Sequence, residues 1–282
     1  MNDLQQCILN IYREVAKILD RHNISYFGTD GTCLGAIRHG GFIPWDDDMD
    51  IVVPVEQIPA VLEILQRELP THLTVYSPFD HAHYPRLIYK VVNIKTTYIE
   101  DCLSDYPDSW SGVWLDIIPL CGVPAPGLRR KWLYHRLARY MFLDLYKRED
   151  YLGSHFTLIQ KLVKYLVVKY RDTNFYLNKQ WRLIAKFPTH KYDYVLETGF
   201  FGHQQWTFAK RLFGKGRKVK FEDVELRVPE LTDEYLTEEY GDYMQLPPVE
   251  KRKRHVGYVD LERPYTDYVA EPNLYYQTKK DA

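Results

Sequence analysis

Apolar residues near the start of the chain follow two different patterns. From Leu4 to Leu19 they recur every three or four positions, which is typical of one face of an α-helix, and Asp3 is placed to cap it. The same spacing over 56–69 predicts a second long helix. A short helix is expected at 33–39, ended by Gly40-Gly41. Short apolar runs between turn residues predict β-strands, at 24–27, 51–54, 73–77, 86–92, 96–101 and 113–120.

The pattern turns helical after a proline- and glycine-containing break at 124–127 and stays so to about residue 186. A β-hairpin over 217–228, turning near Glu222-Asp223, and a helix over 232–240 are expected next. The polar, tyrosine-rich tail after Pro264 is expected to be poorly ordered. The mixture predicts an α+β fold with an inserted helical subdomain. We divide it into a core (1–127), a helical subdomain (128–190), a C-terminal part (191–264) and a tail (265–282).

Composition excludes several classes of protein. Lys plus Arg number 37 against 38 Asp plus Glu, so no excess of positive charge favours nucleic acid as a partner. The four cysteines are widely spaced without a CxxC pair, which argues against a zinc knuckle or a dense disulfide framework. The acidic start of the chain lacks the long apolar stretch of a signal peptide, and the longest lipid-like run, 165–168, is too short to span a bilayer. We expect a soluble, cytoplasmic protein.

The acidic run at 46–50 is the first candidate for chemistry. In an extended strand alternate side chains share a face, so Asp48 and Asp50 would project together, with Asp46 beside them if the strand begins early. Neighbouring carboxylates repel each other unless a cation lies between them, and Mg²⁺ or Mn²⁺ prefers such oxygen ligands. A solvated acidic turn or a loose calcium loop stays an alternative.

Asp116 lies inside an apolar run that favours burial, 113–118. A buried carboxylate needs a cation, an Arg or Lys partner, or a proton, so a structural salt bridge or hydrogen bond is an alternative to a catalytic role. Arriving from a separate strand, Asp116 would complete a two-metal site suited to in-line displacement at phosphorus.

Gly31-Thr32 lies between the strand at 24–27 and the short helix. Glycine lets the backbone approach phosphate, and amide groups at a helix N-terminus favour anions. Single glycines are weak evidence, but the order of strand, Gly-Thr, helix, Asp-x-Asp and a later lone Asp is fairly specific.

These motifs resemble the signature of the LicD family, which includes bacterial phosphocholine transferases and is related to fukutin and fukutin-related protein. The resemblance is carried by GTCLGAIRH (31–39), GFIPWDDDMDI (41–51), GVWLDIIPL (112–120) and YGDYMQLPP…KRKRH (240–255), and covers roughly residues 10 to 255. No motif of the family matches 128–190.

The resemblance implies a nucleotidyltransferase-like mixed sheet flanked by helices. Asp48 and Asp50 correspond to its metal-binding pair, Asp116 to its third carboxylate, and Asp46 to a possible extra ligand. Gly31-Thr32 corresponds to its Gly-Gly/Ser element, with Thr32 a departure from the usual Ser or Gly. The C-terminal part, 191–264, would complete the active site. The implied reaction uses two Mg²⁺ or Mn²⁺ ions and a CDP-activated alcohol, and releases CMP, with Asp116 or a metal-bound hydroxide as base.

Further residues are candidates for substrate binding, each with a structural alternative. Arg38 and His39 could hold donor phosphate or cap a surface helix. Arg86 and Lys90 are four apart on an expected strand, so they would share a face and reach CMP, the acceptor or surface acids.

The remaining candidates lie near the motifs. In the basic cluster of Lys251, Arg252, Arg254 and His255, the resemblance favours an active-site role for Arg252 and His255, against an ordinary solvated face. A choline headgroup would need aromatic faces. Candidates for that cage are Trp45, Trp110, Trp114 and Tyr243.

Three functions therefore stay open. The first is transfer of phosphocholine, or of another phospho-alcohol such as ribitol or glycerol phosphate, to a glycan or a lipid-linked teichoic acid precursor. The second is nucleotidyl transfer from a nucleoside triphosphate. The third is a non-catalytic metal-binding or lipid-surface scaffold that uses the basic helices at 129–182. The first reading also predicts peripheral association with the inner face of the cell membrane.

Overall fold

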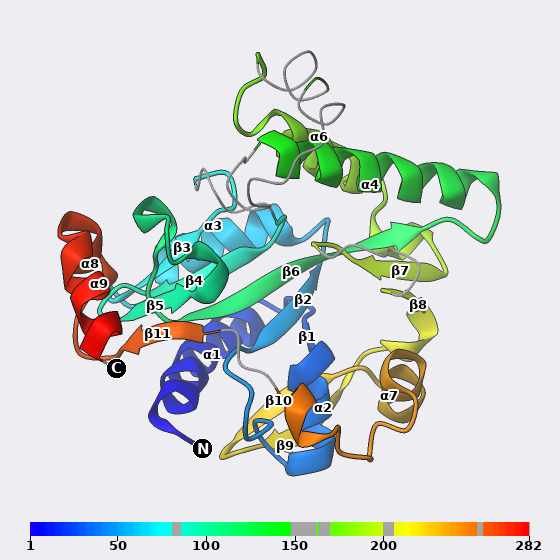
Figure 1. The fold of residues 1–282 in the computed structure, drawn as a ribbon. Helices are drawn as coiled ribbons and strands as arrows, with labels where there is room; N and C mark the ends of the chain where they lie inside the picture. The colour runs from blue at the N-terminus through cyan, green and yellow to red at the C-terminus, as the bar shows by residue number, and fades with distance from the viewer. Residues whose placement is uncertain (81–85, 148–161, 163–169, 200–205, 253–255, 282) are drawn as a thin grey trace.

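A mixed seven-stranded sheet forms the centre of the molecule (Figure 1). The computed structural model describes residues 1–80, 86–147, 162, 170–199, 206–252 and 256–281. The strand order β1-β2-β6-β4-β3 is extended by β7, which pairs with β6, and by β8. The seven strands are β1 (Phe27–Gly28), β2 (Asp50–Pro54), β3 (Leu73–Tyr76), β4 (Tyr89–Asn93), β6 (Trp114–Val123), β7 (Tyr194–Glu197) and β8 (Thr207–Ala209).

Strand β6 is the centre of this sheet. All ten of its residues are buried, as expected for a strand covered on both faces. It pairs with β2 in parallel, and with β4 and β7 in antiparallel fashion over its first and second halves. This is the predicted α+β architecture, a mixed sheet flanked by helices.

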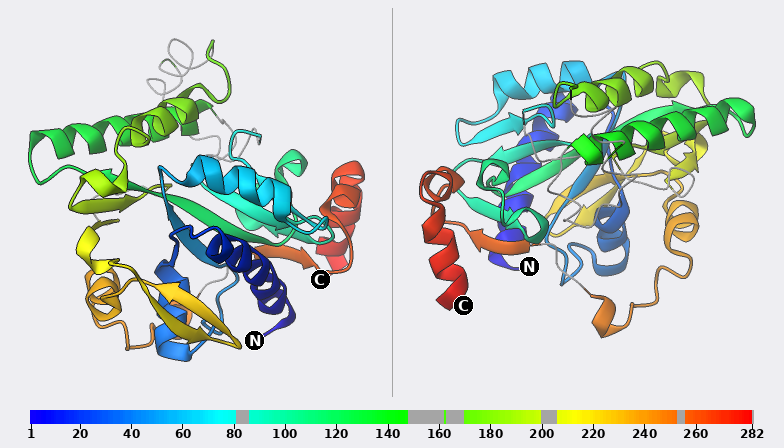
Figure 2. Two further views of the ribbon diagram at one scale, coloured as in Figure 1. Left: turned by 180° about the vertical axis from the view of Figure 1, so that it is seen from behind. Right: turned by 45° about the horizontal axis from the view of Figure 1, so that its top comes forward.

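Helices α1 (Asp3–Arg21) and α3 (Ile58–Glu68) contact each other and pack against the sheet (Figure 2, left). The predicted apolar face of α1 is buried. The prediction that Asp3 caps α1 is wrong, because Asn2 accepts the amide of Gln5 at 2.8 Å while the Gln5 side chain accepts the amide of Asn2. This reciprocal pair satisfies two amide groups that the first helical turn leaves without partners.

Helix α2 (Asp30–His39) begins earlier than predicted, so Gly31 and Thr32 lie in its first turn and not in a turn before it. Thr29 is its N-cap residue, and Gly40 ends it in the left-handed conformation with φ 68°, which costs glycine little. The preceding strand is shorter than predicted, since only Phe27 and Gly28 pair with β2.

Helices α4 (Leu128–Lys147) and α6 (Phe175–Ile184) lie in the segment predicted to be helical. Their apolar residues share a hydrophobic cluster with Cys121, Val123 and Leu196 of the sheet. Residues 148–161 and 163–169 are outside the described part. Segment 191–264 contributes β7 and β8 to the same sheet, and the division into four parts stays a prediction.

The C-terminal third adds smaller elements around the sheet. The predicted hairpin (β9, Arg217–Phe221; β10, Val224–Val228) turns at Glu222-Asp223, and helix α7 spans the predicted Thr232–Tyr240. Strand β11 (Val256–Asp260) pairs with β5 (Thr97–Glu100). Among the helices of the described residues, none is long and apolar enough to cross a membrane.

The tail after Pro264 forms two helices, α8 (Tyr265–Ala270) and α9 (Pro272–Asp281), so the prediction of a poorly ordered tail is wrong. Tyr268 and Tyr275 are buried with Trp110 in a separate hydrophobic cluster. Tyrosine carries a hydroxyl but buries a large apolar ring, so a segment that is polar by composition can still pack into a hydrophobic cluster.

Candidate active site

The pairing of β2 with β6 brings two predicted carboxylates side by side. Asp50 and Asp116 are directly opposite each other in the parallel register, and the amide of Asp116 donates to the carbonyl of Met49 at 3.0 Å. Asp48 lies two residues before Asp50, although β2 begins only at Asp50. Burial and the charges of Asp48, Asp116 and Asp46 all raise the pKa of Asp50. The four predicted metal ligands therefore lie around one site.

Lys90 of β4 is the positive charge inside this site. It lies opposite Asp116 in the sheet, and its Nζ is 2.9 Å from Asp116 Oδ1 and 4.0 Å from a Glu100 carboxylate oxygen. The ammonium also lies 3.6 Å from the centre of the Trp114 ring. Burial raises the pKa of Asp116, and Lys90 opposes that shift. The salt-bridge alternative for Asp116 is thus confirmed, and it does not exclude a catalytic role.

The position of Arg86 differs from the predicted one. Strand β4 begins at Tyr89, so exposed Arg86 does not share a strand face with Lys90. Its charge nevertheless lowers the pKa of Asp116. Arg86 therefore lies at the edge of the site, close enough to act on it electrostatically.

The loop before β2 gathers three further carboxylates. One oxygen from each of Asp46, Asp47 and Asp48 lies within 4.8 Å of the others. Asp47, which was not predicted as a ligand, is buried. The loop is held by Gln5 of α1, whose side-chain amide donates to the carbonyls of Ile43 and Asp46 at 3.1 and 2.9 Å.

This donor set fits a hard divalent cation. It consists of the converging carboxylates of the loop and those of two adjacent strands, and burial followed by the charges of Asp48, Asp116 and Asp46 raises the pKa of Asp50. A cation between such groups removes the repulsion, and oxygen ligands suit Mg²⁺ or Mn²⁺.

Gly31 and Thr32 contact the aspartates directly. A Cβ at Gly31 would lie 2.8 Å from an Asp46 carboxylate oxygen, so a larger residue here would force the Asp46 side chain to shift. The Thr32 hydroxyl accepts the amide of Asp50 at 2.9 Å. Both residues position the carboxylates, and contact with phosphate stays a prediction.

Five predicted substrate-binding residues gather where α2 ends. Arg38 donates to the carbonyl of Tyr243 at 2.9 Å and to the His39 ring at 3.0 Å, and the Arg252 guanidinium lies 4.6 Å from the centre of the Trp45 ring. Burial lowers the pKa of both Arg38 and His39. Trp45 directly precedes the aspartate loop, so this basic and aromatic group borders the carboxylates. His255 and Arg254 lie outside the described residues.

The predicted aromatic cage of four residues is wrong. Trp110 packs against Tyr275 with ring centres 4.9 Å apart, and its indole N–H donates to Leu103. Trp114 faces Lys90 and Tyr98. Trp45 stays near the end of α2, and Tyr243 reaches that region through its carbonyl while its hydroxyl donates to Asp233 at 2.5 Å.

A second group of acidic side chains was missed from the sequence. Asp30, with φ 50°, Glu197 at the end of β7 and Glu239 in α7 interact in the interior. Burial and then the charges of Glu197, Glu239 and Asp50 raise the pKa of Asp30, so the inner group also senses the carboxylates of the candidate site. Burial and Glu239 raise the pKa of Glu197 to about 8. The Tyr235 hydroxyl donates to Glu197 at 3.1 Å and accepts the amide of Asp30 at 3.2 Å. These carboxyl groups lie far apart in the chain, and only the position of Asp30 beside Gly31-Thr32 could have indicated one of them.

Comparison with known proteins shows which proteins this chain is similar to. Residues 23–120, which include Asp46 to Asp50 and Asp116, match the family model described as LicD/FKTN/FKRP, nucleotidyltransferase domain. The chain is 28% identical to the lipopolysaccharide cholinephosphotransferase LicD of Haemophilus influenzae over 262 residues, which are 90% of this chain and 95% of that protein. It is also 38% identical over 56 residues to the ribitol 5-phosphate transferase FKRP of Mus musculus and of Homo sapiens, 18% of this chain and 11% of each of those proteins.

Proposed function

We propose that this chain, whose residues 23–120 match the LicD/FKTN/FKRP family model, is a phospho-alcohol transferase that moves phosphocholine from CDP-choline to a hydroxyl of a cell-surface glycan or teichoic acid precursor. The products are CMP and the phosphocholine-bearing acceptor. The observation that supports this most is the register that sets Asp116 beside Asp50, next to the loop of Asp46 to Asp48. The alternative is that the transferred group is ribitol phosphate or glycerol phosphate, taken from the corresponding CDP-alcohol.

Asp48, Asp50 and Asp116, with Asp46 beside them, are the residues that would hold Mg²⁺ or Mn²⁺. Such ions supply positive charge that neutralises a diphosphate and stabilises the leaving phosphate. On the protein side, the basic group of Arg38, His39 and Arg252 next to Trp45 would bind the anionic donor.

Asp116 is the proposed base. It takes the proton of the acceptor hydroxyl while that oxygen attacks the phosphorus that bears choline, and the bond to the CMP oxygen breaks with its electron pair leaving on CMP. Burial raises the pKa of Asp116 above that of an ordinary carboxyl, which favours proton uptake. Lys90, 2.9 Å away, keeps the resting group ionised and oriented.

CMP release from a panel of donors tests this function. The wild type is incubated with Mg²⁺ and CDP-choline, CDP-ethanolamine, CDP-ribitol, CDP-glycerol or CTP. We expect one CDP-alcohol to yield CMP. Turnover of CTP to pyrophosphate alone would instead indicate a nucleotidyltransferase.

The Asp48→Asn variant tests the site. Its activity should fall at least about 100-fold. Mutating a residue that only hydrogen-bonds to a metal ligand already costs up to about 100-fold, and Asp48 is a proposed ligand itself. Asp193→Asn is the matched control, since Asp193 is exposed before β7. A fully active Asp48→Asn variant would contradict the assignment.

A further inference from the structure

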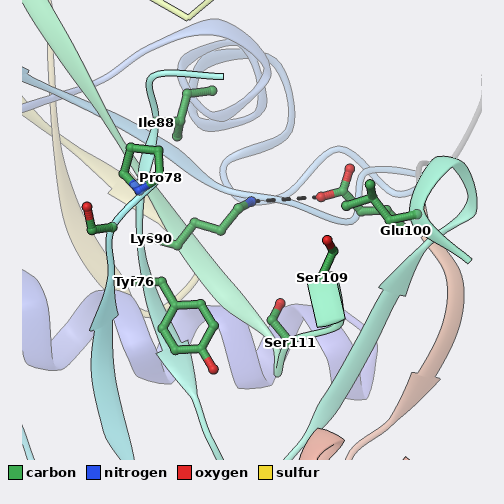
Figure 3. Close-up of a pocket in the computed structure, with 9 residues that line it drawn as sticks. Tyr76, Pro78, Ile88, Lys90, Glu100, Ser109 and Ser111 are labelled. Atoms are coloured by element: carbon green, nitrogen blue, oxygen red, sulfur yellow. Dashed lines mark ion pairs between the residues drawn. The ribbon is translucent and has the colours of Figure 1, made fainter. Parts of the chain in front are cut away.

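The cavity beside Lys90 has no room for a further ligand. Lys90 and Glu100 face each other in it, with the hydroxyls of Ser109 and Ser111 to one side (Figure 3). Its volume is about 20 Å³, which is enough for one water molecule. Helix α4, on the outside of the molecule, offers a much larger surface.

Helix α4 has two faces of different kinds. It lies along one side of the molecule, with the sheet beneath it in Figure 1. Leu133, Leu137 and Met141 recur every four residues and are buried, and the first two pack with Leu177 and Ile184 of α6. The opposite face is turned away from the protein, and we call it the outer face of α4. Its larger side chains, all exposed, are Leu128, Lys131, Trp132, His135, Arg139 and Phe142.

Three large apolar side chains on the outer face are open to solvent. Leu128 is 86% exposed, Trp132 is 49% exposed and Phe142 is 49% exposed. Leu128 and Phe142 lie roughly 21 Å apart along the helix axis, at a rise of about 1.5 Å per residue. Single exposed apolar residues are ordinary, but several along one face of one helix indicate contact with a partner.

The charge of the outer face is positive. Lys131 and Arg139 lie between the apolar side chains, and His135 lies between those two cations along the chain. The one acidic residue of α4, Asp144, is completely buried. No negative charge of this helix therefore reaches the outer face, and the partner that complements it is anionic.

An anionic lipid surface meets both requirements. Its phosphate groups attract lysine and arginine, and the boundary between headgroups and acyl chains accepts tryptophan, phenylalanine and leucine. A second copy of this chain would instead set the cations of two outer faces against each other. A nucleic acid would pair with the cations, but it would leave Leu128 without an apolar environment.

We propose that the outer face of α4 binds the surface of a membrane that contains anionic phospholipid, with Leu128, Trp132 and Phe142 inserted among the headgroups. Helix α4 then lies in the plane of the interface, and among the described residues no helix is long and apolar enough to cross it. Binding there would bring the protein to acceptors that are carried on lipid, and this consequence alone rests on the proposed function.

Co-sedimentation with vesicles tests the charge requirement. The wild type should bind vesicles of mixed phosphatidylcholine and phosphatidylglycerol at least about tenfold more tightly than vesicles of phosphatidylcholine alone, and added salt should weaken that binding. The double variant Lys131→Glu/Arg139→Glu should bind the mixed vesicles at least about 25-fold more weakly, since each cation near an anionic surface contributes about fivefold.

The matched control for charge is Lys215→Glu/Lys220→Glu. It makes the same change in net charge at two exposed lysines near the β9–β10 hairpin, outside α4. Its binding should stay within about threefold of the wild type, because exposed charges more than about 10 Å from the lipid are largely screened. Equal losses in the two double variants would overturn the proposal, because net charge alone would then account for binding.

Substitution of the apolar side chains tests insertion. Trp132→Ser and Phe142→Ser should each weaken binding to the mixed vesicles about 3- to 30-fold, since each loses the burial of half a large apolar side chain. Leu246→Ser is the control, because Leu246 is 48% exposed and lies outside α4. Brominated lipid should quench the tryptophan fluorescence of the wild type, and Trp132→Phe should lose that quenching. Far-ultraviolet circular dichroism checks that each variant is folded.

The proposal would be overturned if the wild type does not bind the mixed vesicles, or if quenching persists in Trp132→Phe. It would also be overturned if the outer face instead supports dimerisation in sedimentation velocity, or binding of single-stranded RNA, without binding to vesicles. None of these assays contains CDP-choline. Their outcome is therefore independent of CMP release, which tests the proposed function separately.

Discussion

Two groups of acidic side chains lie near the start of α2, and their surroundings differ. The proposed catalytic group, Asp48, Asp50 and Asp116, has the ammonium of Lys90 beside it and includes part of the acidic loop at 46–48. The inner group, Asp30, Glu197 and Glu239, is paired with the Tyr235 hydroxyl, and none of the ion pairs among the described residues involves it. Burial raises the pKa of Asp50, Asp116 and all three inner carboxyls.

The comparison shows that burial alone does not define a metal site. The inner carboxyls have no ammonium beside them among the described residues, and burial followed by the charge of Glu239 raises the pKa of Glu197 to about 8, so that they hold protons. The proposed catalytic group borders a loop whose carboxylate oxygens converge within 4.8 Å, and its single ammonium, Lys90, neutralises only part of the negative charge gathered there. We therefore expect the catalytic group to bind cations and the inner group to share protons.

The largest expected effect is on transfer activity. Asp50→Asn should lower kcat/KM for CMP release at least about 100-fold, because a proposed metal ligand is lost. Asp30→Asn is the matched inner variant, since Asn tolerates the positive φ of 50° and keeps a hydrogen-bonding side chain. It should stay within about threefold of the wild type, since the inner group makes no contact with substrate in this account. Equal losses in the two variants would remove the distinction between the groups.

A smaller effect is expected from Lys90→Met. Lys90 lowers the pKa of Asp116, so its removal raises that pKa and leaves less ionised base at a given pH. Activity at neutral pH should fall about 10- to 100-fold, and the acidic limb of the rate profile should move to higher pH. Lys95→Met, at an exposed position in the turn after β4, is the control. A rate profile that does not move would show that Lys90 does not act through Asp116.

Glu197→Gln should change stability and its dependence on pH. The pKa of Glu197 is about 8 in the folded protein and roughly 4.3 in an unfolded chain. Between these values the folded state binds more protons, so the free energy of unfolding of the wild type falls as pH rises. The variant keeps an acceptor for Tyr235 without a charge.

Thermal unfolding measures this effect. Glu197→Gln should be about 1–3 kcal/mol more stable than the wild type near pH 8, several degrees in Tm, with a smaller difference near pH 5. Glu262→Gln, at an exposed position, should show no such trend. A variant less stable than the wild type at pH 8 would mean that Glu197 is ionised and paired in the folded protein.

The carboxylates of the proposed catalytic group could be singled out from the sequence because their signal is local. Asp48 and Asp50 are two residues apart, and Asp116 interrupts an apolar run, so each is visible without knowledge of the fold. The register that sets Asp50 opposite Asp116 and Lys90 depends on the pairing of three strands, which local patterns do not fix. The inner group escaped prediction for the same reason, since its members come from α2, β7 and α7.

Elements were predicted best where one face is apolar over a long stretch. The apolar face of α1 and the buried run of β6 follow directly from their sequences. The two helices of the tail, α8 and α9, could not be predicted in this way. They are held by tyrosine rings packed around Trp110, a contact between segments about 160 residues apart.

Binding of Mn²⁺ followed by electron paramagnetic resonance tests the central claim most directly, because it reports the cation without requiring turnover. The wild type and Asp30→Asn are expected to bind Mn²⁺ alike, and more tightly once CDP-choline is added. Asp50→Asn and Asp116→Asn are expected to bind it at least about tenfold more weakly. Wild-type affinity in both of these variants would contradict the account, because the cation would then be held elsewhere in the molecule.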